Sequence, residues 1–302
     1  MRLSIVIPVL NQFPLTIATY KQLREVTDTL DDDVEFLIID NGSRVPLDES
    51  DVPGATIIRN EYTVGVYPTF LQGFNNTTGD IVAFFHSDLV VWEQNWNERL
   101  IKQFQDNTNL GMVGFIGSNE IDASGGRGLG TTSNFQGRTL SDGLNVWQGS
   151  PASVHGKVSD QLSSAAVVDG CAMIISRDAW EDIGNRDDFP PHHHYDRLIS
   201  CQLLEKGWDV GVLGIECDHF SGQTVNQEDS YSVMAQGWAG KSLGVNSFME
   251  WAEKNKEWTN NSSNPNRGKI PHNWDSVVYM ESEKRFLLEY RDEKHLIPII
   301  KK

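Results

Sequence analysis

Gly79-Asp80-Ile81-Val82-Ala83-Phe84-Phe85-His86-Ser87-Asp88 is the stretch that decides the fold. The continuous apolar run from Ile81 to Phe85, with β-branched and aromatic members, predicts a strand buried on both faces, as in parallel sheets covered by helices. The run ends at His86 and Asp88, and ligands of open α/β sheets bind beyond the carboxyl ends of strands. Side chains two positions apart share one side of a strand. The tripeptide His86-Ser87-Asp88 therefore predicts two metal ligands, His86 and Asp88. The alternative interpretation is a solvated turn after a core strand.

The rest of the chain repeats an alternation of strands and helices. Apolar runs predict strands at 3–10, 34–39, 55–59, 111–116, 167–176 and 208–215, and helical spacing predicts helices at 14–30, 66–76, 92–104, 177–183 and 197–206. This alternation predicts right-handed crossovers and an α/β fold with a mostly parallel central sheet flanked by helices. Residues 117–149, rich in Gly, Ser, Thr and Asn, predict a mobile loop near the site. The polar, acidic residues after 222 predict a small helical appendage.

Charge and composition exclude several classes of protein. The chain has 302 residues and a formal net charge of −17, which argues against sequence-independent nucleic-acid binding because that needs clustered Lys and Arg. A phosphate ester approaching so acidic a protein needs a metal ion or local basic residues. The three cysteines (Cys171, Cys201, Cys217) have no CxxC spacing and are odd in number, which suits free thiols in a reducing compartment. No apolar run approaches the roughly 18 residues of a membrane span. We therefore expect a cytoplasmic protein without a signal peptide or membrane span.

The polar residues at predicted strand ends occur in an order that resembles the glycosyltransferases of the GT-A fold, in particular the large family 2 group. Ile5-Val6-Ile7-Pro8-Val9-Leu10-Asn11 resembles the first strand of that family, and Asp40-Asn41-Gly42-Ser43 resembles its DDGS-like turn. His86-Ser87-Asp88 stands at the place of its metal-binding DxD motif. Tyr195-Asp196, Gly207-Trp208 and Cys217-Asp218-His219 resemble its later ED, G(W/Y) and H elements, so that the resemblance covers residues 3–222.

This resemblance implies a hexosyltransferase that moves a sugar from a nucleoside-diphosphate sugar, of the UDP or GDP type, to a glycan or other hydroxyl acceptor. Asp88, His219 and His86 would hold the metal, and such oxygen and nitrogen ligands suit Mn²⁺, or Mg²⁺. A Lewis acid there would stabilise the departing diphosphate. The implied donor-binding residues are Pro8, Val9, Asn11, Asp40, Asn60, Gly65, His86 and Ser87. For Asp40 the contact would be to the base or ribose, and the alternative is a turn-forming residue before Gly42.

Asp196 is the implied general base, which would take the proton of the acceptor hydroxyl in an inverting reaction. The alternative is that Asp196 caps the helix that follows it. His86 replaces the usual first Asp of DxD and Tyr195 the usual Glu of ED, so a retaining mechanism stays open. A non-catalytic carbohydrate-binding protein on the same fold is the alternative from another class. A sugar-1-phosphate nucleotidyltransferase is disfavoured, because the residues at 11–14 form no basic, glycine-rich loop.

The remaining expectations concern domains, partners and the histidine run. The glycosyltransferase domain would span 1–222, with a nucleotide-binding half at about 1–116 and an acceptor half at about 150–222, and the appendage 223–302 is a candidate surface for homo-oligomerisation. His192-His193-His194 could suggest zinc, but no further Cys or His spacing completes a tetrahedral set. We expect these histidines to line the acceptor side beside Asp196.

Overall fold

The computed structural model describes residues 1–27, 33–121, 139–141, 153–155, 159–220, 229–257, 271 and 273–290. The end of the helix predicted at 14–30, most of the loop predicted at 117–149 and parts of the appendage lie outside the described residues. No helix in the described part of the chain is long and apolar enough to cross a membrane.

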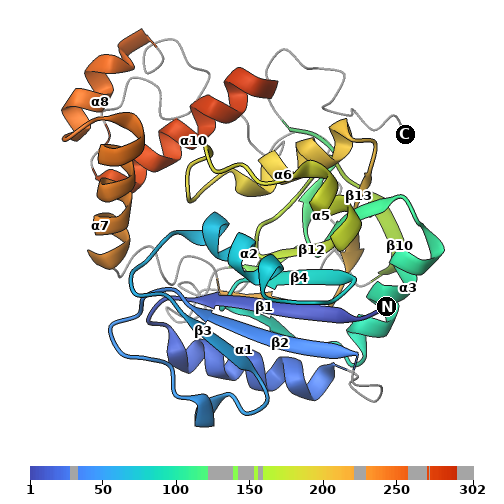
Figure 1. Ribbon diagram of the computed structural model, residues 1–302. Coiled ribbons are helices and arrows are strands. Elements are labelled where there is room, and N and C mark those ends of the chain that lie inside the picture. Colours follow the sequence, from blue (N-terminus) through green and yellow to red (C-terminus); the bar gives the residue numbers. More distant parts are fainter. Residues whose placement is uncertain are drawn as a thin grey trace.

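An eight-stranded sheet forms the centre of the molecule, with the strand order β10-β13-β6-β12-β4-β1-β2-β3 (Figure 1). The strands are β1 (Leu3–Val9), β2 (Val34–Asp40), β3 (Thr56–Arg59), β4 (Ile81–Phe85), β6 (Leu110–Gly114), β10 (Ser159–Ser164), β12 (Ala172–Ser176) and β13 (Asp209–Gly214). The β4-β1-β2-β3 run is parallel, as is β13 to β6, whereas β12 runs antiparallel to both β4 and β6 and β10 antiparallel to β13. The predicted mostly parallel sheet is thus confirmed.

Both faces of this sheet are covered by helices. The lower face in Figure 1 packs against α1 (Phe13–Val26) and α3 (Trp96–Asp106), and the opposite face against α2 (Val66–Asn75), α5 (Arg177–Ile183) and α6 (Tyr195–Glu205). In β4, Ile81 and Phe85 belong to the first apolar core and Val82 and Phe84 to the second. Successive strand side chains point to opposite faces, so an element covered on both sides must be apolar throughout. This explains the continuous apolar run.

Two predicted elements differ from the observed ones. The helix expected from residue 92 begins at Trp96, after the short strand β5 (Leu89–Val91) and a turn over residues 93–95. This strand belongs to a second sheet with the order β5-β14-β8-β9, made with β14 (Cys217–His219), β8 (Thr139–Ser141) and β9 (Ser153–His155). The strand expected at 167–176 is divided into β11 (Val167–Val168), which pairs with β7 (Gly117–Ser118), and β12. A turn at Gly170 and Cys171 separates these two strands, with the Ala172 N–H donating to the Asp169 carbonyl at 3.3 Å.

The C-terminal residues form the expected helices, which lie over the face that α6 covers (Figure 1). They are α7 (Asp229–Trp238), the π-helical η2 (Ala239–Leu243), α8 (Phe248–Lys254) and α10 (Trp274–Tyr290). A small apolar cluster that includes Trp251 and Val277 joins them to one another. Phe286 and Tyr290 of α10 enter the second core of the main sheet, so α10 connects the appendage to the rest of the protein.

Candidate metal centre and adjoining pocket

A pocket opens at the carboxyl ends of the parallel strands. Its described lining is Pro8, Val9, Leu10, Asn41, Thr63, Gly65, Val66, Thr69, His86, Ser87, Asp88, His192 and Tyr231. The cavity has a volume of about 140 Å³, and a single water needs about 10–15 Å³ of such space. It can therefore hold a ligand of many atoms.

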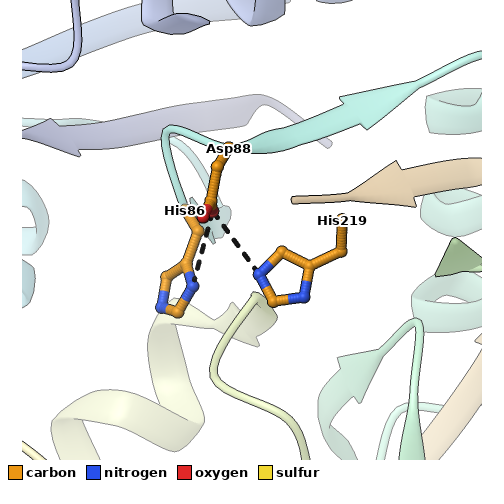
Figure 2. A group of neighbouring side chains, drawn as sticks. All are labelled: His86, Asp88 and His219. Atoms are coloured by element: carbon orange, nitrogen blue, oxygen red, sulfur yellow. Dashed lines mark ion pairs between the residues drawn. The ribbon is translucent and has the colours of Figure 1, made fainter. Parts of the chain in front are cut away.

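Three predicted metal ligands come together beside this pocket (Figure 2). The carboxylate Oδ1 of Asp88 lies 3.4 Å from His219 Nε2 and 3.9 Å from His86 Nδ1, and the three ligand atoms all lie within 4.8 Å of one another. Figure 2 shows both imidazole rings turned towards the Asp88 carboxylate. One carboxylate oxygen and two imidazole nitrogens at these separations fit a divalent cation of the Mn²⁺ type.

Strand pairing explains how His219 reaches residues more than a hundred positions earlier. After β4 the chain turns, with the Leu89 N–H donating to the His86 carbonyl at 3.2 Å. It then continues as β5, which pairs antiparallel with β14 so that Leu89 stands opposite His219. The Phe220 N–H donates to the Asp88 carbonyl at 3.0 Å and extends this pairing. The turn and the second sheet together place the three side chains around one point.

Tyr195 orients the His86 ring. The Tyr195 hydroxyl and His86 Nε2 share a hydrogen bond of 3.0 Å, which leaves Nδ1 facing Asp88. Metal-binding histidines usually bond through their second ring nitrogen to a neighbouring group in this way. Gly170 makes room for the hydroxyl, since a Cβ at that position would lie 2.5 Å from it. Tyr195, which replaces the expected Glu, therefore has a structural connection to the metal centre.

The protonation states of these ligands suit a metal ion. Burial lowers the pKa of His86, and the nearby charge of Asp88 offsets only part of this effect. Burial alone would raise the pKa of Asp88, but the hydrogen bond from His219 and the electrostatic influence of both histidines outweigh it and lower that pKa. At neutral pH His86 is thus uncharged and Asp88 is ionised, which are the forms that bind cations.

The donor-binding residues predicted from the sequence divide into two groups. Pro8, Val9, Gly65, His86 and Ser87 line the pocket, whereas Asn11, Asp40 and Asn60 are absent from its described lining. The side chains of those three bond to the loops around the pocket, and their contacts with a donor stay a prediction.

Asp40 is buried and its carboxylate is already engaged. It pairs with the Arg59 guanidinium and accepts hydrogen bonds from the backbone N–H groups of Ser43 at 2.9 Å and Leu47 at 3.4 Å. The contact to Ser43 is the turn role that was the alternative interpretation. A nucleotide contact of Asp40 stays a prediction.

Asn41, the residue after Asp40, lines the pocket, whereas Asp40 is absent from its described lining. The sequence pattern did not indicate Asn41 as a site residue. Its side chain accepts from Val64 N–H at 3.1 Å and from the Asn60 amide at 3.0 Å, and so ties the turn after β2 to the segment before α2. Asn11 similarly accepts from the Arg44 N–H at 2.7 Å. Only its position beside Asp40 could have drawn attention to Asn41.

Asp196 lies in the first turn of α6, is 8% exposed, and is not among the described residues that line the pocket. Its Oδ1 accepts from the Arg197 N–H at 2.9 Å and from the Arg197 guanidinium at 3.3 Å. The N-cap position belongs to His194, so the expectation that Asp196 is the N-cap residue is wrong, although its carboxylate satisfies one N–H of the first helical turn. Its role as a base stays a prediction.

Comparison with known proteins places this geometry in context. Residues 4–183 match the sequence model described as glycosyl transferase family 2. A protein of Mycobacterium tuberculosis assigned by its description to the glycosyltransferases is 32% identical over 96 residues, which are 30% of this chain and 28% of that protein. The chain thus spans less than a third of the length of this relative.

Two solved structures share the fold. The mannosyltransferase PcManGT from Pyrobaculum calidifontis, in complex with GDP-Man and Mn²⁺, is 12% identical with a TM-score of 0.50, over 96% of this chain and 75% of that one. GalNAc-T7, with UDP, GalNAc and Mn²⁺, is 12% identical with a TM-score of 0.55, over 99% of this chain and 58% of that one. These likenesses confirm the predicted GT-A fold class.

Proposed function

The chain belongs to glycosyl transferase family 2, and on this premise we propose that it transfers a sugar from a nucleoside-diphosphate sugar to a hydroxyl acceptor with the help of a divalent cation. The observation that carries the proposal is the group of His86, Asp88 and His219 at the edge of a pocket formed by strand ends. A catalytic site of this kind needs both a cation and room for the ligand in one place.

A cation at this site would supply the positive charge that a diphosphate donor needs. A protein with a net charge of −17 repels a diphosphate, so the donor needs local positive charge in order to bind. A cation held by His86, Asp88 and His219 would act as a Lewis acid that stabilises the diphosphate leaving group. The nitrogen and oxygen ligands favour Mn²⁺, with Mg²⁺ as the second choice. The two similar structures contain Mn²⁺, which supports this preference.

The donor would extend from the metal centre towards the ends of β1 and β2. Pro8, Val9, Gly65 and Ser87 are proposed to contact it directly, together with Asn41, which shares their pocket. Asn11, Asp40 and Asn60 are proposed to belong to the donor side as well: they hold the loops around Asn41 and Gly65, and Asp40 would contact the base or ribose. The complexes of the similar structures with GDP-Man and with UDP support a donor of the GDP or UDP type.

The acceptor side is proposed to lie towards α6. Asp196 would take the proton of the attacking hydroxyl in an inverting reaction, with Arg197 holding one carboxylate oxygen. Residues 1–222 would form the catalytic domain, and the C-terminal helices an appendage to it. A retaining reaction on the same site is the second candidate, because His219 adds an imidazole to the metal centre.

Thermal unfolding tests this function. We would measure the unfolding midpoint with UDP, GDP, dTDP and CMP-linked ligands, with and without Mn²⁺. A ligand at about 100 times its Kd stabilises the folded state by about 2.7 kcal/mol. Stabilisation by one nucleotide that requires Mn²⁺ and is lost in Asp88→Ala would support the transferase.

The control for that experiment is Asp182→Ala, which removes an equal charge from a half-exposed side chain on α5. It should respond to ligands as the unchanged protein does. If no nucleotide stabilises the protein, the transferase is refuted and a carbohydrate-binding protein becomes the better explanation.

A further inference from the structure

One wall of the pocket is built by residues outside the segment that matches the family. His192 lies between α5 and α6, and Tyr231 belongs to α7 of the appendage, whereas the family match ends at residue 183. The two rings meet edge to face, with centroids 4.8 Å apart and an interplanar angle of 70°. This is a favourable packing for aromatic pairs. The appendage is therefore part of the pocket.

His192 presents an unsatisfied polar atom. Its Nδ1 is buried and has no hydrogen-bond partner among the described residues. Nearly all buried polar atoms of folded proteins have a partner in the protein, in an ordered water or in a ligand, so the Nδ1 of this pocket-lining residue is a candidate contact for a ligand. Burial, together with the neighbouring His193 and His86, holds the pKa of His192 well below its ordinary value. The imidazole is thus uncharged at neutral pH and matches an uncharged hydroxyl better than a phosphate.

The backbone around His192 is held in an uncommon conformation. His193 and His194 have φ values of 62° and 54°, a left-handed region that side chains other than glycine rarely adopt. Such strain persists only where the surroundings enforce it, and it concentrates at functional sites. Here the His192 carbonyl accepts from the Ser282 hydroxyl at 2.8 Å, and the Tyr67 N–H donates to the Pro191 carbonyl at 3.1 Å.

α10 also positions both members of the wall. Asp275 lies 2.8 Å from His193 Nε2, and its charge adds to the effect of burial in raising the pKa of Tyr231. The Tyr279 ring packs against His193 and His194, with centroids 5.1 Å and 5.0 Å apart. One carboxylate and one aromatic ring of α10 thus fix the segment that carries His192.

We propose that His192 and Tyr231 form a subsite for a sugar ring, in which His192 Nδ1 bonds a sugar hydroxyl and Tyr231 supplies apolar surface. The proposal rests on the proposed function, because it places the nucleotide at the strand ends and the diphosphate at the metal. The sugar is either that of the donor or that of the acceptor, since both offer hydroxyls on a pyranose ring. Asp275 is a positioning residue for this subsite.

Calorimetric titration in the presence of Mn²⁺ tests the donor source. UDP is compared with UDP-glucose, and GDP with GDP-mannose, in the unchanged protein, in His192→Leu and in His192→Asn. Losing one buried hydrogen bond should weaken binding of the sugar conjugate about tenfold. Binding of the bare nucleoside diphosphate should stay within about twofold. Because the Asn amide stands where Nδ1 stands, His192→Asn should recover most of the loss.

Methyl glycosides of glucose, galactose and mannose test the acceptor source by saturation-transfer NMR, with and without a saturating nucleoside diphosphate. A signal that His192→Leu abolishes, with conjugate binding unchanged, assigns the subsite to the acceptor. Val233→Ala, an exposed position on the same helix as Tyr231, is the control and should change neither measurement.

Two results overturn the inference. One is that neither the conjugates nor the methyl glycosides distinguish His192→Leu from the unchanged protein. The other is that the bare nucleotide loses as much affinity as its conjugate, which would place His192 with the nucleotide. If no nucleotide binds the unchanged protein, the proposed function fails, while the methyl glycosides measured alone still decide for or against a sugar subsite.

Discussion

Replacing Tyr195 by Phe removes a single oxygen from the surroundings of the candidate metal centre. The Tyr195 ring is 6% exposed and packs edge to face on Phe70, with centroids 5.4 Å apart, so the Phe ring can keep this position. What is lost is the 3.0 Å hydrogen bond to His86 Nε2. A metal ion on Nδ1 requires the ring proton on Nε2, and that proton would then have no partner.

Two free energies follow from this loss. Removing the partner that orients a metal-binding histidine costs about 10–100-fold in metal affinity, or about 1.4–2.8 kcal/mol. The folded protein also loses a buried hydrogen bond and leaves Nε2 unsatisfied, which costs about 1–3 kcal/mol. We therefore expect Tyr195→Phe to bind Mn²⁺ at least about tenfold more weakly and to unfold at lower urea concentration.

Calorimetric titration with Mn²⁺, beside urea unfolding without metal, separates these effects. The control is Tyr20→Phe, because the buried Tyr20 hydroxyl donates to the Pro53 carbonyl at 2.6 Å in the other core. It should lose stability but keep its Mn²⁺ affinity. If Tyr195→Phe loses stability and yet binds Mn²⁺ within twofold of the unchanged protein, Tyr195 does not orient a metal-binding His86.

Two further predictions concern stability. Gly65→Ala should lower the free energy of unfolding in urea more than Gly184→Ala does. Both glycines have positive φ, but a Cβ at Gly65 would lie 2.5 Å from Pro191, whereas a Cβ at Gly184 would meet nothing within 4 Å. Equal losses of stability in the two variants would contradict this. His192 and His194 have pKa values well below 6.5, so below that pH the unfolded chain binds more protons. Stability should fall with decreasing pH by up to about 1.4 kcal/mol per unit for each histidine, and His194→Gln should reduce this slope; an unchanged slope would refute it.

The order of strands and helices follows directly from the sequence. The runs 3–9, 34–40 and 81–85 are apolar at nearly every position, and a strand covered on both faces leaves no position for polar side chains. The same reasoning located His86 and Asp88, because side chains just beyond such strands meet at one edge of a parallel sheet. Resemblance to the family then added His219, which the structure brings to the same point.

Contacts between distant segments do not follow from local sequence patterns. Nothing in the sequence near residue 90 indicates that β5 will pair with β14, and that pairing is what brings His219 to Asp88. The antiparallel β12 within a mostly parallel sheet also depends on how the chain returns after a long connection. Such pairings are chosen by the packing of the whole fold, and a local pattern of side chains carries no record of the partner strand.

Which residues line the pocket also depends on the tertiary structure. Asp40 and Asn41 are neighbours in one turn, yet the Arg59 guanidinium engages Asp40 while Asn41 lines the pocket. Tyr231 lies in α7, beyond the last described strand, and no strand-end pattern indicates it. The sequence by itself determined which segments form strands covered on both faces and that His86 and Asp88 follow such a strand, since these features depend on local periodicity. Only the tertiary structure decided which side chains share the pocket, because that depends on which surfaces exclude water together.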